Sequence, residues 1–268
     1  MAKAHAHPAA IRSSARPEVD PAPTVRTISV ADVKAALAQG YDDFLAMPRH
    51  TPFLGIIYAL VCFFLVRMAF NYSLLPLVFP LIAGMALLGP FAAVGLYDLS
   101  RRREQGLDTG LRHAFAVGKS PQTGSIVRLG LALVAVFFFW LMAAFAIFQV
   151  TIGDAPAGPV AFLQQVLTTP GGWALIIIGN GVGALFALGV FATTVVSFPM
   201  LVDRRVTVGT AVETSIAAVR ANPGPMLTWA AIVVGLLALG ALPLFVGLAV
   251  VLPVLGHATW HLYRRVVV

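Results

Sequence analysis

The feature that most constrains this chain is the length of its apolar runs. From Met226 to Tyr263 the sequence holds no Asp, Glu, Lys or Arg. As a single helix, at about 1.5 Å per residue, this run would be nearly twice as long as the roughly 30 Å hydrocarbon core of a bilayer. Gly240 and Pro243 interrupt it, and both residue types favour a turn. The run therefore predicts two membrane-spanning helices joined by a tight hairpin.

Comparable runs elsewhere in the chain raise the expected number of membrane spans to six. A span needs about 20 predominantly apolar residues. The composition agrees, because 59% of the residues are hydrophobic and only 11% are charged, whereas soluble domains carry about 25% charged residues. We therefore expect an all-α, polytopic membrane protein. The predicted spans are 52–70, 74–99, 126–151, 173–202, 226–241 and 242–263.

The distribution of Lys and Arg predicts the orientation, because these residues favour the cytoplasmic ends of spans. With six spans, one side holds the N-terminal arm, the 100–125 loop, the 203–225 loop and the C-terminus. The opposite connections carry no basic residue, and only Arg67 falls on that half. Both termini are thus predicted to be cytoplasmic, and the net charge of +7 reflects topology rather than a nucleic-acid partner. The basic residues on the predicted cytoplasmic side are Arg49, Arg101, Arg102, Arg103, Arg112, Lys119, Arg204, Arg205, Arg220, Arg264 and Arg265.

A stretch with helical periodicity precedes each predicted pair of spans, which indicates an internal repeat. The unit is an amphipathic interfacial helix followed by a transmembrane hairpin, and it occurs three times within a membrane domain of residues 27–268. These helices either steer the next span into the membrane or form a cytoplasmic collar that docks lipid headgroups or a partner protein. Residues 1–26 are expected to be a disordered cytoplasmic tail. The periodic apolar residues are Val30, Val33, Leu37, Tyr41 and Phe44, then Leu107, Leu111 and Phe115, then Val208, Val212, Ile216 and Val219.

Basic residues gather at the predicted cytoplasmic ends of the second and fourth spans. Arg101, Arg102 and Arg103 are consecutive, and Arg204 and Arg205 follow the fourth span. They are candidates for contact with anionic lipid or with a partner, beside their role as an orientation signal. Asp98 is expected to be an ion-pair partner of the arginines.

Arg67 and Asn180 are further candidate residues within predicted spans. Arg67 can extend to the outer interface, bind an anion or pair with Asp154. Asn180 lies among Gly179, Gly181 and Gly183, whose small size permits close helix packing, so we expect it to form an interhelical hydrogen bond or to contact a ligand.

His257 and His261 are one helical turn apart, a spacing that allows two imidazoles to bind one metal ion or a haem. No Asp, Glu or Cys near them in the sequence completes a ligand set. Packing at the interface is the other interpretation, and both remain open. The single cysteine, Cys62, excludes an internal disulfide and a cysteine metal cluster.

The sequence lacks the motifs of common active sites. It contains no phosphate-binding glycine loop with its lysine, no nucleophile elbow and no pair of carboxylates with the proximity that acid-base catalysis needs. We therefore expect no enzymatic activity and no cofactor.

Four segments carry a resemblance to a known family. VADVKAALAQGYDDF, GPFAAVGLYDLSRRREQG, VRANPGPMLTWA and GHATWHLYRR resemble an uncharacterised family of bacterial, mainly proteobacterial, predicted integral membrane proteins, a domain of unknown function. The pattern of amphipathic helix and hairpin is more distantly similar to the membrane domain attached to some glycerophosphodiester phosphodiesterases. The resemblance implies a location in the bacterial inner membrane, and it implies no activity.

Three hypotheses of function follow. The first is a non-catalytic inner-membrane protein that serves as an accessory, structural or assembly component of a larger membrane complex, such as a respiratory one, with lipids and other integral membrane proteins as partners. The alternative is a transporter or lipid-handling protein. The third is haem or metal binding through His257 and His261.

Overall fold

The computed structural model describes residues 23–47, 51–71, 74–114, 118, 120–154 and 158–268. The described chain is built from helices, and its one β-bridge joins Val25 to Val267. This confirms the all-α prediction. Residues 1–22 of the predicted tail lie outside the described part, whereas the backbones of Thr24 and Arg26 hydrogen-bond to those of Val268 and Val266.

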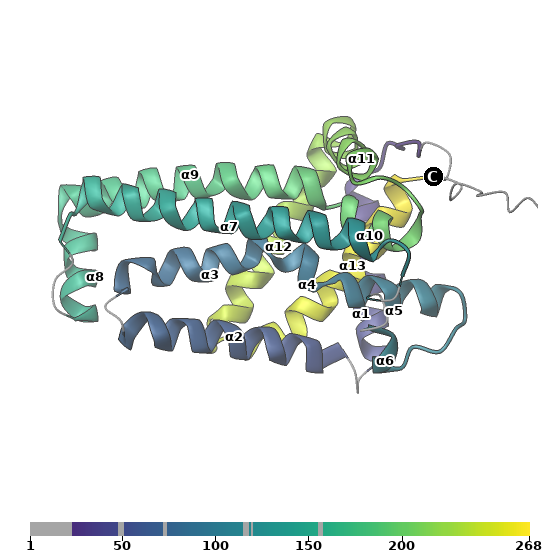
Figure 1. The fold of residues 1–268 in the computed structure, drawn as a ribbon, viewed down its shortest axis with the longest axis horizontal. Helices are drawn as coiled ribbons and strands as arrows, with labels where there is room; N and C mark the ends of the chain where they lie inside the picture. Colours follow the sequence, from purple (N-terminus) through teal and green to yellow (C-terminus); the bar gives the residue numbers. More distant parts are fainter. Residues whose placement is uncertain (1–22, 48–50, 72–73, 115–117, 119, 155–157) are drawn as a thin grey trace, which may run out of the picture.

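Long apolar helices run side by side along the molecule's long axis (Figure 1). They include α2 (Thr51–Asn71), α7 (Thr123–Thr151) and α9 (Pro170–Thr194), which continues into α10 (Ser197–Asp203). Among the described residues, three of the six predicted spans correspond to segments long and apolar enough to cross a membrane: Thr123–Thr151, Pro170–Asp203 and Pro223–Ala241. Gly55–Met68 and Leu75–Leu87 are shorter apolar helices. Their outer faces carry many exposed large hydrophobic side chains, as expected of surfaces that meet lipid.

The second predicted span is divided into several short helices. They are the 3-10 helix η1 (Leu75–Leu77), α3 (Val78–Leu87), α4 (Gly89–Ala92) and α5 (Val94–Glu104). Pro90 explains the interruption after Leu87, because a proline cannot donate the backbone hydrogen bond that continues a helix.

A turn lies at the predicted position near Gly240, and of the two helices that it joins only the first is among the candidate membrane spans of the described residues. Helix α12 (Pro223–Ala241) ends close to Gly240, and α13 (Leu248–Val266) begins after a short turn. A Cβ atom on Gly247 would lie 2.8 Å from the Cα of Gly240, so the end of α12 and the start of α13 approach each other at glycines. Leu244 and Phe245 have positive φ angles within the turn.

Trp140 holds the centre of the bundle together. Its indole Nε1 donates a hydrogen bond of 2.8 Å to the carbonyl oxygen of Pro80 on α3, and 4% of the residue is exposed. Its ring packs against Phe186 of α9. A Cβ on Gly84 would lie 2.9 Å from the Trp140 ring. The Trp140 side chain of α7 therefore contacts both α3 and α9.

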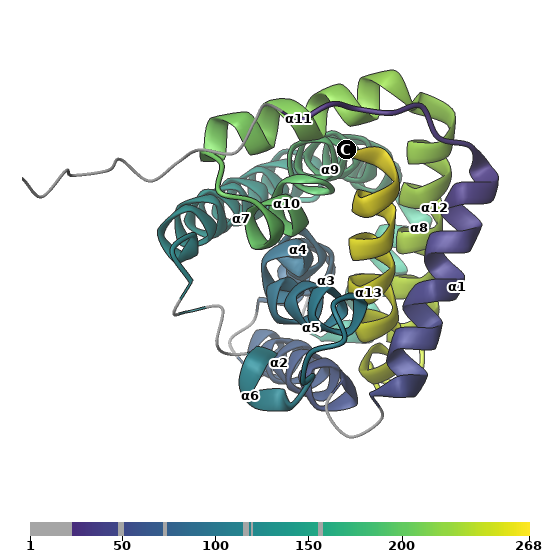
Figure 2. The same ribbon diagram turned by 90° about the vertical axis from the view of Figure 1, so that its right-hand side faces the viewer.

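Two amphipathic helices, α1 (Val30–Ala46) and α11 (Val208–Ala221), lie across the long axis at one end of the bundle (Figure 2). We call this end the basic end, because α5, the end of α10 and the C-terminal turn of α13 bring most of the arginines there. The short α6 (Leu111–Ala114) also lies at this end, whereas α8 (Pro159–Thr168) lies at the opposite one. The predicted amphipathic segment with Leu107, Leu111 and Phe115 is described only in part, because Phe115 lies outside the described residues.

The face that α1 buries differs from the predicted one. Val33, Ala36, Gly40 and Asp43 are buried, and Tyr41 is half exposed. Helix α11 behaves in the same way and buries small or polar residues, namely Ala211, Thr214, Ser215 and Ala218. Several larger apolar residues of the two helices, namely Leu37, Val208, Val212 and Val219, are partly buried and pack against the edge of the hydrophobic core.

Candidate functional site

Five polar side chains meet where α1, α5 and α13 pack together at the basic end. They are Asp43, Ser100, Arg103, His257 and His261, here called the Asp43 cluster. Asp43 and His257 are buried, with 2% and 0% of their surfaces exposed. Three segments distant in the sequence therefore contribute to one enclosed polar site.

Asp43 is the centre of the cluster. Its carboxylate accepts a 2.5 Å hydrogen bond from the Ser100 hydroxyl and lies 2.9 Å from Nε2 of His261. Arg103 forms an ion pair with the other carboxylate oxygen. Burial alone would raise the pKa of Asp43, but the hydrogen bonds from His261 and Ser100 hold this pKa below its usual value. A buried carboxylate that is paired and hydrogen-bonded in this way fastens α1 to the bundle.

Both histidines are engaged within the cluster. The Nδ1 atom of His257 lies 2.7 Å from the Ser100 hydroxyl oxygen. Its Nε2 atom is enclosed beside the backbone of Leu96 without a well-formed hydrogen bond. No group of three or more His, Cys, Asp or Glu side chains suited to a metal ion occurs among the described residues. The two imidazoles are thus hydrogen-bonded to Ser100 and Asp43, and metal or haem binding by His257 and His261 stays a prediction.

A second set of polar contacts surrounds the cluster on the surface of the basic end. Glu104 accepts hydrogen bonds from the Trp260 indole and from Arg264. Asp203 accepts a 2.7 Å hydrogen bond from the Tyr263 hydroxyl. These contacts join the end of α13 to the ends of α5 and α10.

Asn222 fastens the segment that precedes α1. Its Oδ1 accepts a 2.7 Å hydrogen bond from the backbone of Ile28, and its Nδ2 donates to the backbone carbonyl of Arg26. The β-bridge between Val25 and Val267 continues this attachment.

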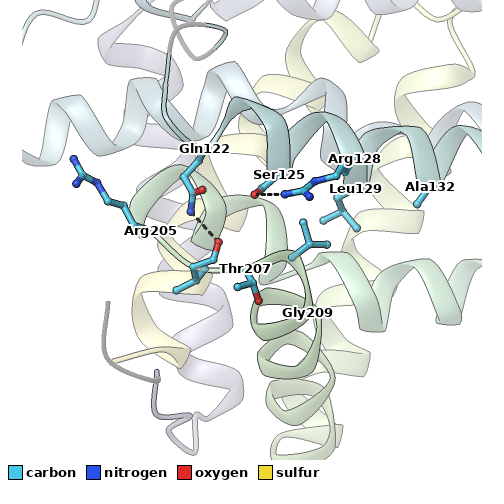
Figure 3. Close-up of a pocket in the computed structure, with 10 residues that line it drawn as sticks. Gln122, Ser125, Arg128, Leu129, Ala132, Arg205, Thr207 and Gly209 are labelled. Atoms are coloured by element: carbon cyan, nitrogen blue, oxygen red, sulfur yellow. Dashed lines mark hydrogen bonds between the residues drawn. The ribbon is translucent and has the colours of Figure 1, made fainter. Parts of the chain in front are cut away.

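A cavity of about 530 Å³ lies between the first turns of α7 and α11 (Figure 3). We call it the basic cavity, because its lining contains Arg128 and Arg205 and no acidic residue. The Arg128 guanidinium turns back toward the start of α7, where it donates to the Ser125 hydroxyl and to the Gly124 carbonyl. Figure 3 shows Arg205 at the edge of the group, with its side chain directed away from the other labelled lining residues. The remaining lining residues are Gln122, Ser125, Leu129, Ala132, Val206, Thr207, Val208 and Gly209.

A second cavity, of about 350 Å³, adjoins the basic cavity and shares Gln122 and Arg205 with it. Its lining also includes Asp98, Arg101 and Arg102. The Gln122 side chain donates to the carbonyl oxygens of Arg204 and Val206 and so shapes the wall between the two cavities.

The predicted basic residues fall into different surroundings. Arg101 forms a 2.5 Å ion pair with Asp98, as expected of that aspartate. Arg102 donates to the carbonyl of Asp108. Arg103 turns inward to Asp43, and Arg204 and Arg205 line the second cavity.

The two predicted polar residues of the spans are separate from these sites. Arg67 is exposed near the end of α2, and the ion pairs found in the described part of the chain do not join it to Asp154. Asn180 is exposed on α9, and its amide donates to the carbonyl of Ile176 in the same helix. The expected interhelical hydrogen bond of Asn180 is therefore replaced by one within the helix.

Sequence reasoning missed Asp43, Ser100, Glu104 and Arg128. Asp43 lies outside the periodic apolar set of this segment, so the periodicity gives no signal that it is buried. Arg128 carried a detectable signal: a charge just inside the start of a span must extend back to the interface or find a partner.

Residues 78–203, slightly less than half of the chain, match a protein family described as "Predicted integral membrane protein (DUF2189)". This segment runs from α3 to the end of α10. Neither the curated proteins nor the solved structures include a match to the chain. The match and the apolar helices establish an integral membrane protein similar to a family of unknown function. The more distant likeness to glycerophosphodiester phosphodiesterases stays a prediction.

Proposed function

We propose that this chain is a non-catalytic component of a larger membrane complex, in an accessory, structural or assembly role. The observation that carries the proposal is the position of Asn180. Helix α9 begins at Pro170, and Asn180 lies ten residues further along it. Ten residues correspond to about 15 Å of helix, which is half the thickness of the hydrocarbon core. If the span begins at Pro170, Asn180 therefore lies near the middle of the bilayer. Its side chain is exposed on the outside of the bundle.

The surroundings of Asn180 suit a second transmembrane helix. Gly181, Ala184 and Leu188 are also exposed and share its helical face. A Cβ atom added at Gly181 would meet nothing within 4 Å. Small residues let another helix approach closely, and an amide can hydrogen-bond across the contact. An amide that faces lipid instead leaves hydrogen-bonding capacity unsatisfied, which is costly in hydrocarbon.

The proposed topology has six spans with both termini on the cytoplasmic side of a bacterial inner membrane. Two contacts support termini on one side. Arg103, at the end of α5, pairs with Asp43 of the N-terminal helix α1. Arg264, near the C-terminus, lies 3.2 Å from Glu104 at the end of the same α5. Lipids and other integral membrane proteins are the proposed partners.

The experiment is purification from native membranes in mild detergent, followed by mass spectrometry of the copurifying chains. We expect a fixed set of partner subunits with the unmodified chain. Gly181→Leu should reduce their recovery at least about tenfold, because the larger side chain blocks close approach. The matched control is Ala231→Leu, at an exposed position on α12. A solitary chain, or equal loss in both variants, would refute the proposal, and a second copy of the chain would identify a homo-oligomer instead.

A second candidate function is transport or lipid handling, which a cavity bordered by Arg101–Arg103 and Asn180 would favour. Both cavities described above lie at the basic end, whereas Asn180 faces outward from the middle of α9. The arrangement favours a site at the membrane surface over a route through the bundle.

A further inference from the structure

The basic cavity contains an arginine near the start of the candidate membrane span α7, and its lining includes no acidic residue. Arg128 lies five residues after Thr123, the first residue of α7, which places its Cα about 7 Å beyond the helix start. Its hydrogen bonds to Gly124 and Ser125 direct the guanidinium back toward that start. This is the geometry of an arginine that extends from the hydrocarbon region to the level of the lipid headgroups.

The opposite wall of the cavity also favours an anion. The first turn of α11 contributes Val208 and Gly209, whose backbone N–H groups have no acceptor within the helix. The Thr207 hydroxyl caps the backbone N–H of Thr210 and leaves these two groups available. The positive end of the helix dipole points the same way. Arg205 adds a second positive charge at the rim.

An apolar track leads away from the cavity along α7. Ala132 lines the cavity one turn beyond Arg128, and Ala135 and Phe139 continue the same face. All three are exposed on the side of the bundle that would meet lipid. A ligand that suits this arrangement has a phosphate at one end and a hydrocarbon chain at the other.

We propose that the basic cavity binds the phosphate of one anionic phospholipid, with an acyl chain along Ala132, Ala135 and Phe139. Arg128 holds the phosphate, and the first turn of α11 completes the site. The bound lipid then joins the amphipathic helix α11 to the spanning helix α7. This site is independent of the partner surface on α9.

The test is native mass spectrometry of delipidated protein titrated with dioleoyl phosphatidylglycerol or with dioleoyl phosphatidylcholine. We expect one phosphatidylglycerol to bind in preference to phosphatidylcholine. Arg128→Gln should weaken this binding at least about tenfold, as expected for the loss of a charge-assisted hydrogen bond. Arg220→Gln is the matched control, because Arg220 is an exposed arginine of α11 outside the lining. It should change the affinity by less than about twofold.

A second variant tests the acyl track without a change of charge. Ala132→Trp places a bulky ring at an exposed position and should also weaken phosphatidylglycerol binding. Thermal unfolding of each variant identifies any that are misfolded, and Arg128→Met, which also removes the charge, serves as a folded substitute if Arg128→Gln is one of them. Equal affinity for the two lipids, or unchanged affinity in the Arg128 variants and in Ala132→Trp, would overturn the proposal. Inorganic phosphate that binds through Arg128 while phosphatidylglycerol does not would assign the cavity to a soluble anion.

Discussion

At the scale of single residues, the buried carboxylate of Asp43 determines how the basic end is held together. Asp43→Asn keeps the shape of the side chain but removes the charge that Arg103 and His261 face. We expect it to lower the free energy of unfolding by about 1–3 kcal/mol, because a charged hydrogen-bonding partner is lost from a buried site. Thermal unfolding in detergent measures the change. The neighbouring Asp42→Asn, at an exposed position of the same helix, should leave stability nearly unchanged, and equal effects would contradict this role.

The same carboxylate predicts a dependence on pH. The pKa of Asp43 is lowered in the folded protein, so its contribution to stability is complete above its usual pKa of 3.8 and is lost as the pH falls through the lower folded value. The difference in stability between the unmodified protein and Asp43→Asn should therefore be largest near neutral pH and shrink below about pH 4. Unfolding curves of both proteins over this range measure it. If the difference in stability between the two proteins instead grew on acidification, the prediction that folding lowers the pKa of Asp43 would be contradicted.

At the scale of elements, the packing of α1 on α13 depends on a glycine. A Cβ atom at Gly40 would lie 2.4 Å from the backbone nitrogen of Ala258 and 2.5 Å from its Cβ. Because the obstacle includes backbone, Gly40→Ala must push the helices apart, and we expect a loss of about 1–3 kcal/mol in the free energy of unfolding. Gly235→Ala, where a Cβ meets nothing within 4 Å on α12, is the control. It should be neutral or slightly stabilising, since alanine favours helix.

These contacts also explain which elements could be predicted from the sequence. The long apolar helices and the turn near Gly240 were predictable, because bilayer thickness fixes span length and glycine and proline mark turns. The buried face of α1 was not, because periodicity selects large apolar residues, whereas packing against Ala258 requires Gly40 and leaves Tyr41 half exposed. Of the Asp43 cluster, Arg103, His257 and His261 were singled out in the sequence, whereas Asp43 and Ser100 were not. Their association could not be predicted, because the five residues come from three distant segments.

At the scale of the whole molecule, the contacts between the two terminal helices and α5 predict a topology. Asp43 of α1 and Arg264 of α13 both contact residues at the end of α5, so the N-terminal helix, the C-terminus and the 100–125 loop should lie on one side of the membrane. Asp154, in the connection after α7, should lie on the other side.

Cysteine labelling tests this topology. In a Cys62→Ala background, a single cysteine replaces either Glu213 or Asp154, and a membrane-impermeant thiol reagent is added to the vesicles. In right-side-out vesicles we expect labelling at position 154 and protection at position 213, and inverted vesicles should reverse the pattern. Labelling of both positions from the same side would contradict six spans, because an odd number of crossings separates these residues in the proposed arrangement.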